Sequence, residues 1–207
     1  MLKNGAIKIC DMKKYQIKSP ICNVYKYPSD NSVLETQFLF GEKVSIIRQE
    51  NDWYSCMSEN DNYQGWIKKI NLESPHEKTH VVCWPMAHIY KEPEIKSKII
   101  SSLFLNSKVK IISEDTQWCQ IKYNTENYFI FKKHIIEIKK NKNNWFNNIF
   151  LFLNAPYLWG GKTIQGIDCS GLIQVSLNFA GLYFPRNTSD QLNYCVKEFK
   201  ILEKIQK

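Results

Sequence analysis

Arginine, paired cysteines and long apolar runs are scarce in this 207-residue chain, and each scarcity argues against a class of function. Only Arg48 and Arg186 are arginine among 28 basic residues, and the lysines are scattered among asparagines and isoleucines. The net charge of +8 therefore predicts general solubility, because a nucleic-acid surface clusters its basic residues. The longest apolar run, residues 149–153, is too short to span a bilayer.

The seven cysteines include no Cys-x-x-Cys pair, which argues against a disulfide framework and suits a reducing compartment. The N-terminal residues lack an apolar segment of signal-peptide length. We therefore expect a cytoplasmic protein with no nucleic-acid partner and no membrane insertion. The pattern gives no indication of an oligomeric state.

Histidine is also scarce, with four residues at positions 76, 80, 88 and 134. His76, His80 and Cys83 lie in or just after the polar segment 74–80. A zinc site needs a fourth ligand at typical spacing, and none follows. We predict solvated linker residues, no metal and no cofactor.

Two stretches of the chain match one another without gaps when they are aligned 65 residues apart. The aligned pairs include Tyr25 with Tyr90, Pro28 with Pro93, Lys43-Val44 with Lys108-Val109, Ile46-Ile47 with Ile111-Ile112, and Trp53 with Trp118. This period is too long for a solenoid repeat. The match therefore predicts a duplicated small domain, in which Asn106 replaces Gly41.

Both stretches have the alternating apolar pattern of half-buried strands, for example at Val109, Ile111, Cys119, Ile121 and Tyr123. Polar turns separate the short strands, which favours a small β-barrel. The order Tyr-x-x-Pro, Gly41-Glu42-Lys43-Val44, Trp53 and Gly65-Trp66-Ile67 resembles the bacterial SH3-like domain. The expected copies span residues 20–72 and 81–138.

From residue 143 the pattern becomes helical. Trp145, Ile149, Phe152 and Leu153 are spaced to form one apolar stripe, and Pro156 is expected to end that helix. A second helix should start at or just before Cys169, bury Leu172, Ile173, Ser176, Leu177 and Ala180, and stop at Gly181. Thr188 and Gln191 have the spacing of a capping box that starts a third helix.

A cysteine in the first turn of a helix faces the positive end of the macrodipole and unpaired backbone amides, which favour the nucleophilic thiolate. The charge of Asp168 beside Cys169 opposes this effect unless its carboxylate is engaged elsewhere. Two partners are open to that carboxylate: it can cap the helix, or it can hold a cation of the substrate.

The flanking motifs carry a family resemblance. The segments 155–161 (APYLWGG) and 166–174 (GIDCSGLIQ), then Gly181, Pro185-Arg186 and Gln191, resemble the NlpC-type cell-wall peptidases, which are papain-like cysteine hydrolases. The resemblance covers residues 143–207. With the paired SH3-like copies ahead of it, the chain is similar to γ-D-glutamyl-L-diamino-acid endopeptidases of bacteria.

The resemblance implies the roles of five residues. Cys169 would be the nucleophile, and Tyr157 would line the cleft beside it. Asp168 and Ser170 would fix the free amino end of a peptidoglycan-derived peptide. Tyr63, in the turn Tyr-Gln-Gly-Trp of the first copy, would contact the substrate, with either Glu35 or Glu42 as its acidic partner.

The family pattern continues after the cysteine with a Gly-Asp-Leu strand, a catalytic histidine and a polar residue that orients it. No histidine follows Cys169 here. We therefore expect a C-terminally truncated product whose helices expose part of their apolar faces. The expected fold class is multidomain: two small all-β SH3-like barrels followed by the N-terminal helical half of an α+β papain-like domain.

Three functions are compatible with the sequence. The first is a thiol protease that cleaves the γ-D-glutamyl–diamino-acid bond through a thioester on Cys169. The second is a catalytically inactive remnant that still binds peptide or cell wall through its SH3-like pair. The third, a lipid acyltransferase of the same superfamily, fits the motif blocks less well.

Overall fold

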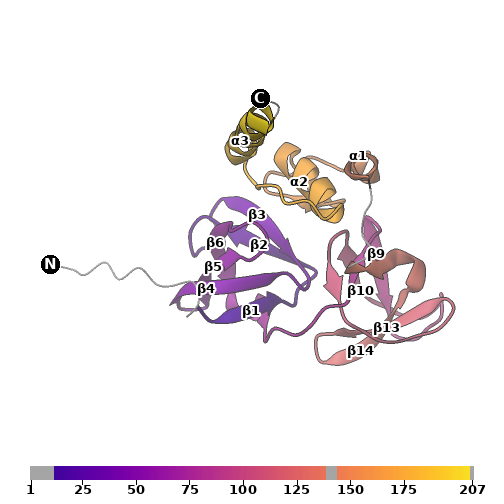
Figure 1. The fold of residues 1–207 in the computed structure, drawn as a ribbon. Coiled ribbons are helices and arrows are strands. Elements are labelled where there is room, and N and C mark those ends of the chain that lie inside the picture. The colour runs from indigo at the N-terminus through magenta and orange to yellow at the C-terminus, as the bar shows by residue number, and fades with distance from the viewer. Residues whose placement is uncertain (1–11, 139–143, 206–207) are drawn as a thin grey trace.

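The computed structural model describes residues 12–138 and 144–205, with side chains as far as residue 198. Two β-rich units lie side by side, and three helices cover the same end of both (Figure 1). No helix in these residues is long and apolar enough to cross a membrane.

The first unit is a seven-stranded antiparallel sheet in the order β3-β2-β6-β5-β4-β1-β7. Its strands are β1 (Lys14–Ile17), β2 (Ile21–Tyr25), β3 (Leu34–Leu39), β4 (Lys43–Glu50), β5 (Trp53–Ser58), β6 (Gln64–Lys68) and β7 (Leu72–Glu73). A 3₁₀ turn at Lys69–Asn71 precedes the last strand. Side chains from these strands, among them Ile17, Val24, Phe38, Val44 and Ile67, form its core.

The second unit forms a sheet in the order β10-β9-β14-β13-β12 and another in the order β11-β8-β15. Its strands are β8 (His80–Val82), β9 (Met86–Tyr90), β10 (Ile99–Phe104), β11 (Lys108–Val109), β12 (Ile111–Glu114), β13 (Trp118–Tyr123), β14 (Glu126–Phe131) and β15 (Ile135–Glu137). A 3₁₀ turn at Lys132–His134 precedes β15.

The two units have the same strand connections. β10 lies 65 residues after its counterpart β3, and β13 lies 65 residues after its counterpart β5. In the first unit, the single strand β4 pairs with both β5 and β1. In the second unit, two strands divide this role: β12 pairs with β13, and β11 pairs with β8. Gly41 and Asn106 occupy equivalent turns with φ of 79° and 75°. Asparagine therefore keeps the left-handed backbone that glycine supplies in the first unit.

The units also share packing. Phe40, from the first unit, lies in the core of the second beside Val82, Leu103 and Ile121. The backbone N–H of Lys108 donates to the carbonyl of Phe40 at 2.8 Å.

The helical part contains α1 (Trp145–Ile149), α2 (Cys169–Phe179), α3 (Thr188–Ile205), a 3₁₀ turn at Phe150–Phe152 and a two-residue hairpin of β16 (Lys162–Thr163) and β17 (Gly166–Ile167). Phe152, Ile167, Val175 and Phe179 pack with Val81 and Leu105 of the second unit. This third core fixes α2 against the β-rich body.

The expected stripe on the first helix is wrong. α1 has only five residues, and the helix ends well before Pro156. Trp145 and Leu153 are exposed, while Asn148 is buried and donates to the carbonyl of Ser176 at 3.0 Å. A polar side chain thus joins α1 to α2 where an apolar contact was expected. The expectation that the helices expose part of their apolar faces is confirmed at Trp145 and Leu153, which are 38% and 70% exposed, whereas Phe152 is buried.

α2 starts at Cys169, as expected, and Gly181 follows its end with φ 79°. Burial of Ser176 is confirmed, but the rest of the buried face differs from the prediction. Gln174, Val175 and Phe179 face inward, whereas Leu172, Ile173, Leu177 and Ala180 are half-buried. The observed buried face of α2 is offset by about one position from the predicted apolar face, because it includes Gln174, a polar residue that is fully buried. Its Nε2 donates to Asp61 Oδ2 at 2.7 Å and to the carbonyl of Phe184 at 3.1 Å, whereas its Oε1 is buried without a hydrogen bond.

Candidate functional site

Cys169 occupies the first position of α2 and is exposed. Asp168 is the N-cap, and its Oδ1 accepts a hydrogen bond from the backbone N–H of Gly171 at 2.7 Å. The capping interpretation of Asp168 is therefore confirmed. An exposed thiol at the start of a buried helix is placed for attack on a bound carbonyl.

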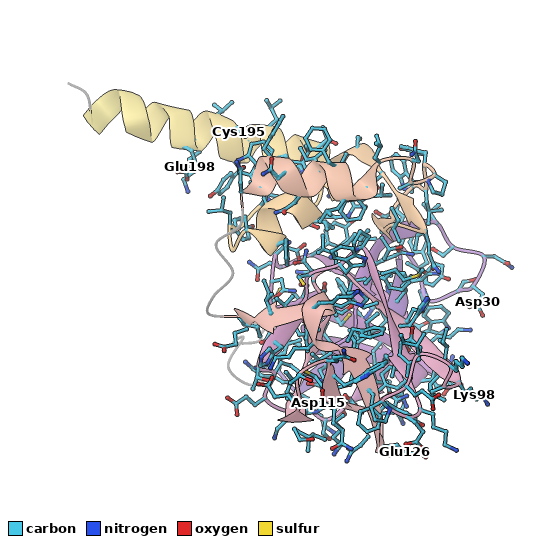
Figure 2. All side chains as sticks on the ribbon, turned by 90° about the vertical axis from the view of Figure 1, so that its right-hand side faces the viewer. Asp30, Lys98, Asp115, Glu126, Cys195 and Glu198 are labelled. Atoms are coloured by element: carbon cyan, nitrogen blue, oxygen red, sulfur yellow. The ribbon has the colours of Figure 1, made fainter. Side chains whose placement is uncertain are left out.

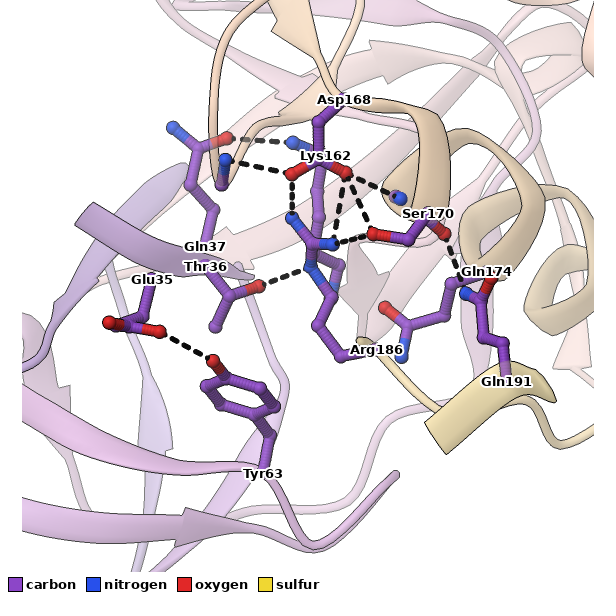
Figure 3. A network of polar contacts seen from close by, with 12 residues as sticks. Glu35, Thr36, Gln37, Tyr63, Lys162, Asp168, Ser170, Gln174, Arg186 and Gln191 are labelled. Atoms are coloured by element: carbon purple, nitrogen blue, oxygen red, sulfur yellow. Dashed lines mark hydrogen bonds and ion pairs between the residues drawn. The ribbon is translucent and has the colours of Figure 1, made fainter. Parts of the chain in front are cut away.

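The carboxylate of Asp168 is held by a buried arginine (Figure 3). Arg186 donates from Nη2 to Asp168 Oδ2 at 2.6 Å and from Nη1 to Asp168 Oδ1 at 3.0 Å. The two side chains are only 2% and 8% exposed. Burial raises the pKa of Asp168, but the bonds and charge of Arg186 outweigh it and bring this pKa below 3.8.

Two further donors complete the shell of Asp168. The backbone N–H of Gly160 donates to Oδ2 at 2.8 Å, and the Ser170 hydroxyl donates to Oδ1 at 3.2 Å. Ser170 Oγ also accepts from Arg186 Nη1 at 2.8 Å. The charge of Asp168 is thus compensated inside the protein, which removes the main objection to a thiolate at its neighbour.

Arg186 also connects this network to the first β unit. Its Nε donates to Thr36 Oγ1, on β3, at 2.8 Å. One side chain thereby joins the start of α2, the segment before α3 and the first sheet.

The glycine loop before β16 packs directly on β3. Gly160 has φ 77°, and a Cβ there would lie 2.9 Å from Leu34 Cγ and 3.2 Å from the backbone carbon of Glu35. Lys162 follows, and its backbone N–H donates to Gln37 Oε1 at 3.0 Å. The glycines of the motif therefore allow the loop to approach the first unit closely.

Tyr63 lies on the first unit, facing this network (Figure 3). Its hydroxyl donates to Glu35 Oε2 at 3.0 Å. Burial and the neighbouring Glu35 raise the pKa of Tyr63 to about 12, although Arg186 and Asn187 act in the opposite direction. Of the two acids left open by the sequence, the structure pairs Glu35 with Tyr63, while Glu42 contacts Lys162.

Tyr157 lies apart from these contacts. Its backbone forms a parallel bridge with Ile167, two residues before Cys169, and its side chain is 68% exposed. The structure thus brings together Asp168, Ser170 and, across from them, Tyr63. The Tyr157 side chain takes no part in these contacts.

Several polar side chains of the site were not identified in the sequence as site residues. Arg186, Gln174 and Gln191 all lie in the motif segments that carry the family resemblance, and Arg186 has a further signal because it is one of only two arginines in a lysine-rich chain. Gln191 was assigned to a capping box, which is wrong: its Nε2 donates to the carbonyls of Ser170 and Pro185, both at 2.9 Å. Gln174 reaches the first unit, where its Nε2 donates to Asp61 Oδ2 at 2.7 Å.

No group of three histidine, cysteine, aspartate or glutamate side chains in residues 12–138 and 144–198 could hold a metal ion. His76 instead donates its backbone N–H to Gln16 Oε1 at 3.0 Å, and His80 contacts Thr79.

Comparison with known families matches two parts of the chain. Residues 24–72 match the family described as Bacterial dipeptidyl-peptidase Sh3 domain, and residues 154–207 match the NlpC/P60 family. These segments contain Tyr63 and Cys169, respectively.

Individual relatives agree with the family matches. The chain is 29% identical over 178 residues to a γ-D-glutamyl-L-lysine dipeptidyl-peptidase of Bacillus subtilis, covering 78% of this chain but 58% of that protein's length. It is 25% identical over 209 residues to dipeptidyl-peptidase 6 of Lysinibacillus sphaericus, covering 90% of this chain and 76% of the relative. A crystal structure of an NlpC/P60 family protein from Bacillus cereus shares the fold, with a TM-score of 0.74 at 21% identity, over 86% of this chain and 76% of that one.

Proposed function

We propose a substrate and a mechanism for this chain. It joins an SH3 domain of the bacterial dipeptidyl-peptidase type to an NlpC/P60 segment and is homologous to γ-D-glutamyl-L-lysine dipeptidyl-peptidases. It is thus a cysteine peptidase by family. The substrate is a short peptidoglycan-derived peptide with a free amino end. The bond attacked is the one between γ-D-glutamate and the diamino acid.

The observation that carries the proposal is the buried Arg186. It ties Asp168 and Ser170, which flank Cys169, to Thr36 on the strand that also bears Glu35. The Glu35–Tyr63 pair is thereby fixed relative to the nucleophile. A peptide whose amino end meets this pair can present its γ-carbonyl to Cys169.

The amine site follows from the charges. Glu35 is a half-buried carboxylate that accepts a hydrogen bond from the Tyr63 hydroxyl, and a carboxylate has acceptor capacity left for an ammonium group. Asp168 already accepts from four groups, one of them cationic. We assign the ammonium to Glu35 and Tyr63, and place Asp168 and Ser170 on the opposite side. Tyr157 covers the approach to Cys169.

The reaction needs a base. Attack by the Cys169 sulfur on the γ-carbonyl carbon forms a thioester and expels the amine of the diamino acid, which must gain a proton. The four histidines are engaged elsewhere: His76 beside Gln16, His80 on β8 beside Thr79, His88 beside Ser102, and His134 stacked on Trp84. We therefore expect these 207 residues to bind the peptide with little turnover.

The second candidate function is peptide or cell-wall binding without cleavage. It is favoured by the two β units, whose strand connections agree. We propose that both are SH3-like, with boundaries at 20–72 and 81–138, and that residues 143–207 are the peptidase segment. Six thiols of the described residues have no disulfide partner, at positions 22, 56, 83, 119, 169 and 195, which agrees with a cytoplasmic location.

Titration calorimetry with L-Ala-γ-D-Glu tests the site. The variants Tyr63→Phe and Glu35→Gln should each weaken binding about tenfold or more, because each removes a polar contact to a charged ammonium. Tyr128→Phe is the matched control, since Tyr128 occupies the equivalent place in the second unit and donates to the exposed Glu126. Equal losses in all three variants would contradict the assignment.

Incubation with L-Ala-γ-D-Glu-diaminopimelate separates the two candidates. The chain should show no cleavage above that of the Cys169→Ala variant. Cleavage that depends on Cys169 would show that a proton donor and acceptor exist within these residues, and would exclude the binding-only function.

A further inference from the structure

A partly open cavity lies at the end of α2 that is opposite Cys169. This cavity of about 250 Å³ is bordered by all three parts of the chain. Its polar lining comprises Glu42 and Asn60 of the first unit, Asn106 and Lys108 of the second, and Lys162 and Asn178 of the helical part. Its volume lies below the range of roughly 300–1,000 Å³ typical of drug-sized ligands, so it suits a small metabolite.

One carboxylate oxygen in this lining has no partner. Glu42 is only 4% exposed. Its Oε1 receives one long contact from Lys162 Nζ at 3.4 Å, while its Oε2 is buried without any hydrogen bond. A buried carboxylate oxygen left unpaired is costly. A donor from a bound molecule would satisfy it.

Two ammonium groups face the same space. Lys162 is 5% exposed, and within the described residues its Nζ makes only the long contact to Glu42 Oε1 at 3.4 Å. Lys108 Nζ donates to Asn60 Oδ1 at 3.1 Å. Each ammonium carries three donors, so both have hydrogen-bonding capacity left for an anion.

The charges of the lining define the complementary ligand. Two cations and one anion are matched by a molecule with two carboxylates and one ammonium group. The surplus of positive charge also disfavours a metal cation.

We propose that this cavity binds a free acidic amino acid, with its ammonium on Glu42 Oε2 and its carboxylates on Lys162 and Lys108. The site is separate from the peptide site at Cys169 and does not depend on the proposed function. Because Lys162 follows the loop that packs on β3, a bound ligand would join all three parts of the chain.

Titration calorimetry of the 207-residue chain with L- and D-glutamate tests the proposal. At least one enantiomer should bind at millimolar concentration. Glutarate lacks the ammonium and should bind at least about tenfold more weakly. L-Lysine has the reversed charges and should not bind. No heat from either enantiomer, or equal binding of glutarate or lysine, would overturn the proposal, because the cavity would then hold water or an unselected solute.

Two pairs of variants locate the binding. Lys108→Met should weaken glutamate binding at least about tenfold, because it removes one carboxylate partner, whereas exposed Lys110→Met should not. Lys108 is only half-buried, so its loss should leave the fold intact, which a melting curve verifies. Glu42→Gln keeps the shape but removes the ammonium partner, and exposed Glu50→Gln is its control. Unchanged binding in Lys108→Met would overturn the assignment.

Discussion

Arg186 is the residue on which the geometry around Cys169 depends most. Its guanidinium forms two hydrogen bonds to the Asp168 carboxylate and also donates to the hydroxyls of Ser170 and Thr36. The planar fork of arginine suits this task, and lysine could not reproduce it.

The variant Arg186→Met should be strongly destabilised. It leaves the buried Asp168 carboxylate without its counter-charge, and removal of one partner of a buried ion pair costs about 3–5 kcal/mol. The free energy of unfolding from denaturant titration measures this. Arg48→Met is the matched control: Arg48 is exposed and lies over the Trp66 ring at 4.6 Å, a contact that contributes about 0.5–1 kcal/mol. Similar losses in both variants would contradict the role of Arg186.

The lowered pKa of Asp168 predicts that the folded protein loses stability in acid. The pKa of Asp168 in the folded protein lies below 3.8, the ordinary value, so the unfolded chain takes up the proton first as pH falls. The stabilisation is present above pH 3.8 and is lost as pH falls through the lower folded pKa. The difference in unfolding free energy between wild type and Asp168→Asn should therefore shrink as pH falls from neutral to below 3.8. A difference that is independent of pH would refute this.

At the scale of elements, the turn after β3 joins the two β units. Gly41 has φ 79°, and a Cβ there would collide with the carbonyl oxygen of Lys108. Asn106, in the equivalent turn, has φ 75° and donates its amide to the carbonyl of Val175 on α2 at 2.9 Å. One turn contacts the other unit, and its counterpart contacts the helix.

Gly41→Ala should lower the free energy of unfolding by at least ~1–2 kcal/mol, since the left-handed backbone alone has that cost for an L-residue. Thermal or denaturant unfolding measures the loss. Asn62→Gly is an informative comparison, because Asn62 has φ 59° in an exposed turn. Its effect should stay within about 1 kcal/mol. A tolerated Gly41→Ala would mean that the turn can shift.

The sequence predicted the elements whose signals are local. The start of α2, its Asp168 cap and its Gly181 stop follow from residues within one or two turns. The face of α2 did not follow, because burial of Gln174 depends on Asp61, more than a hundred residues away. The capping role given to Gln191 failed for the same reason: its amide bonds to Ser170 on another element.

At the scale of the whole molecule, polar side chains join the three parts. The first unit meets the helical part through Thr36, Gln37 and Asp61, and the second unit meets α2 through Asn106. Sequence periodicity predicts each part but not these long-range pairings. The choice of Glu35 over Glu42 as the partner of Tyr63 also needed three-dimensional information.

The most direct test of the central claim is the alkylation rate of Cys169 with and without L-Ala-γ-D-Glu. Mass spectrometry of the digested protein measures each thiol separately. Cys195, exposed on the projecting helix α3 (Figure 2), is the internal control. At ten times the dissociation constant the peptide should slow alkylation of Cys169 by about tenfold and leave Cys195 unchanged. If the bound peptide leaves Cys169 as reactive as before, the peptide site is not at the start of α2.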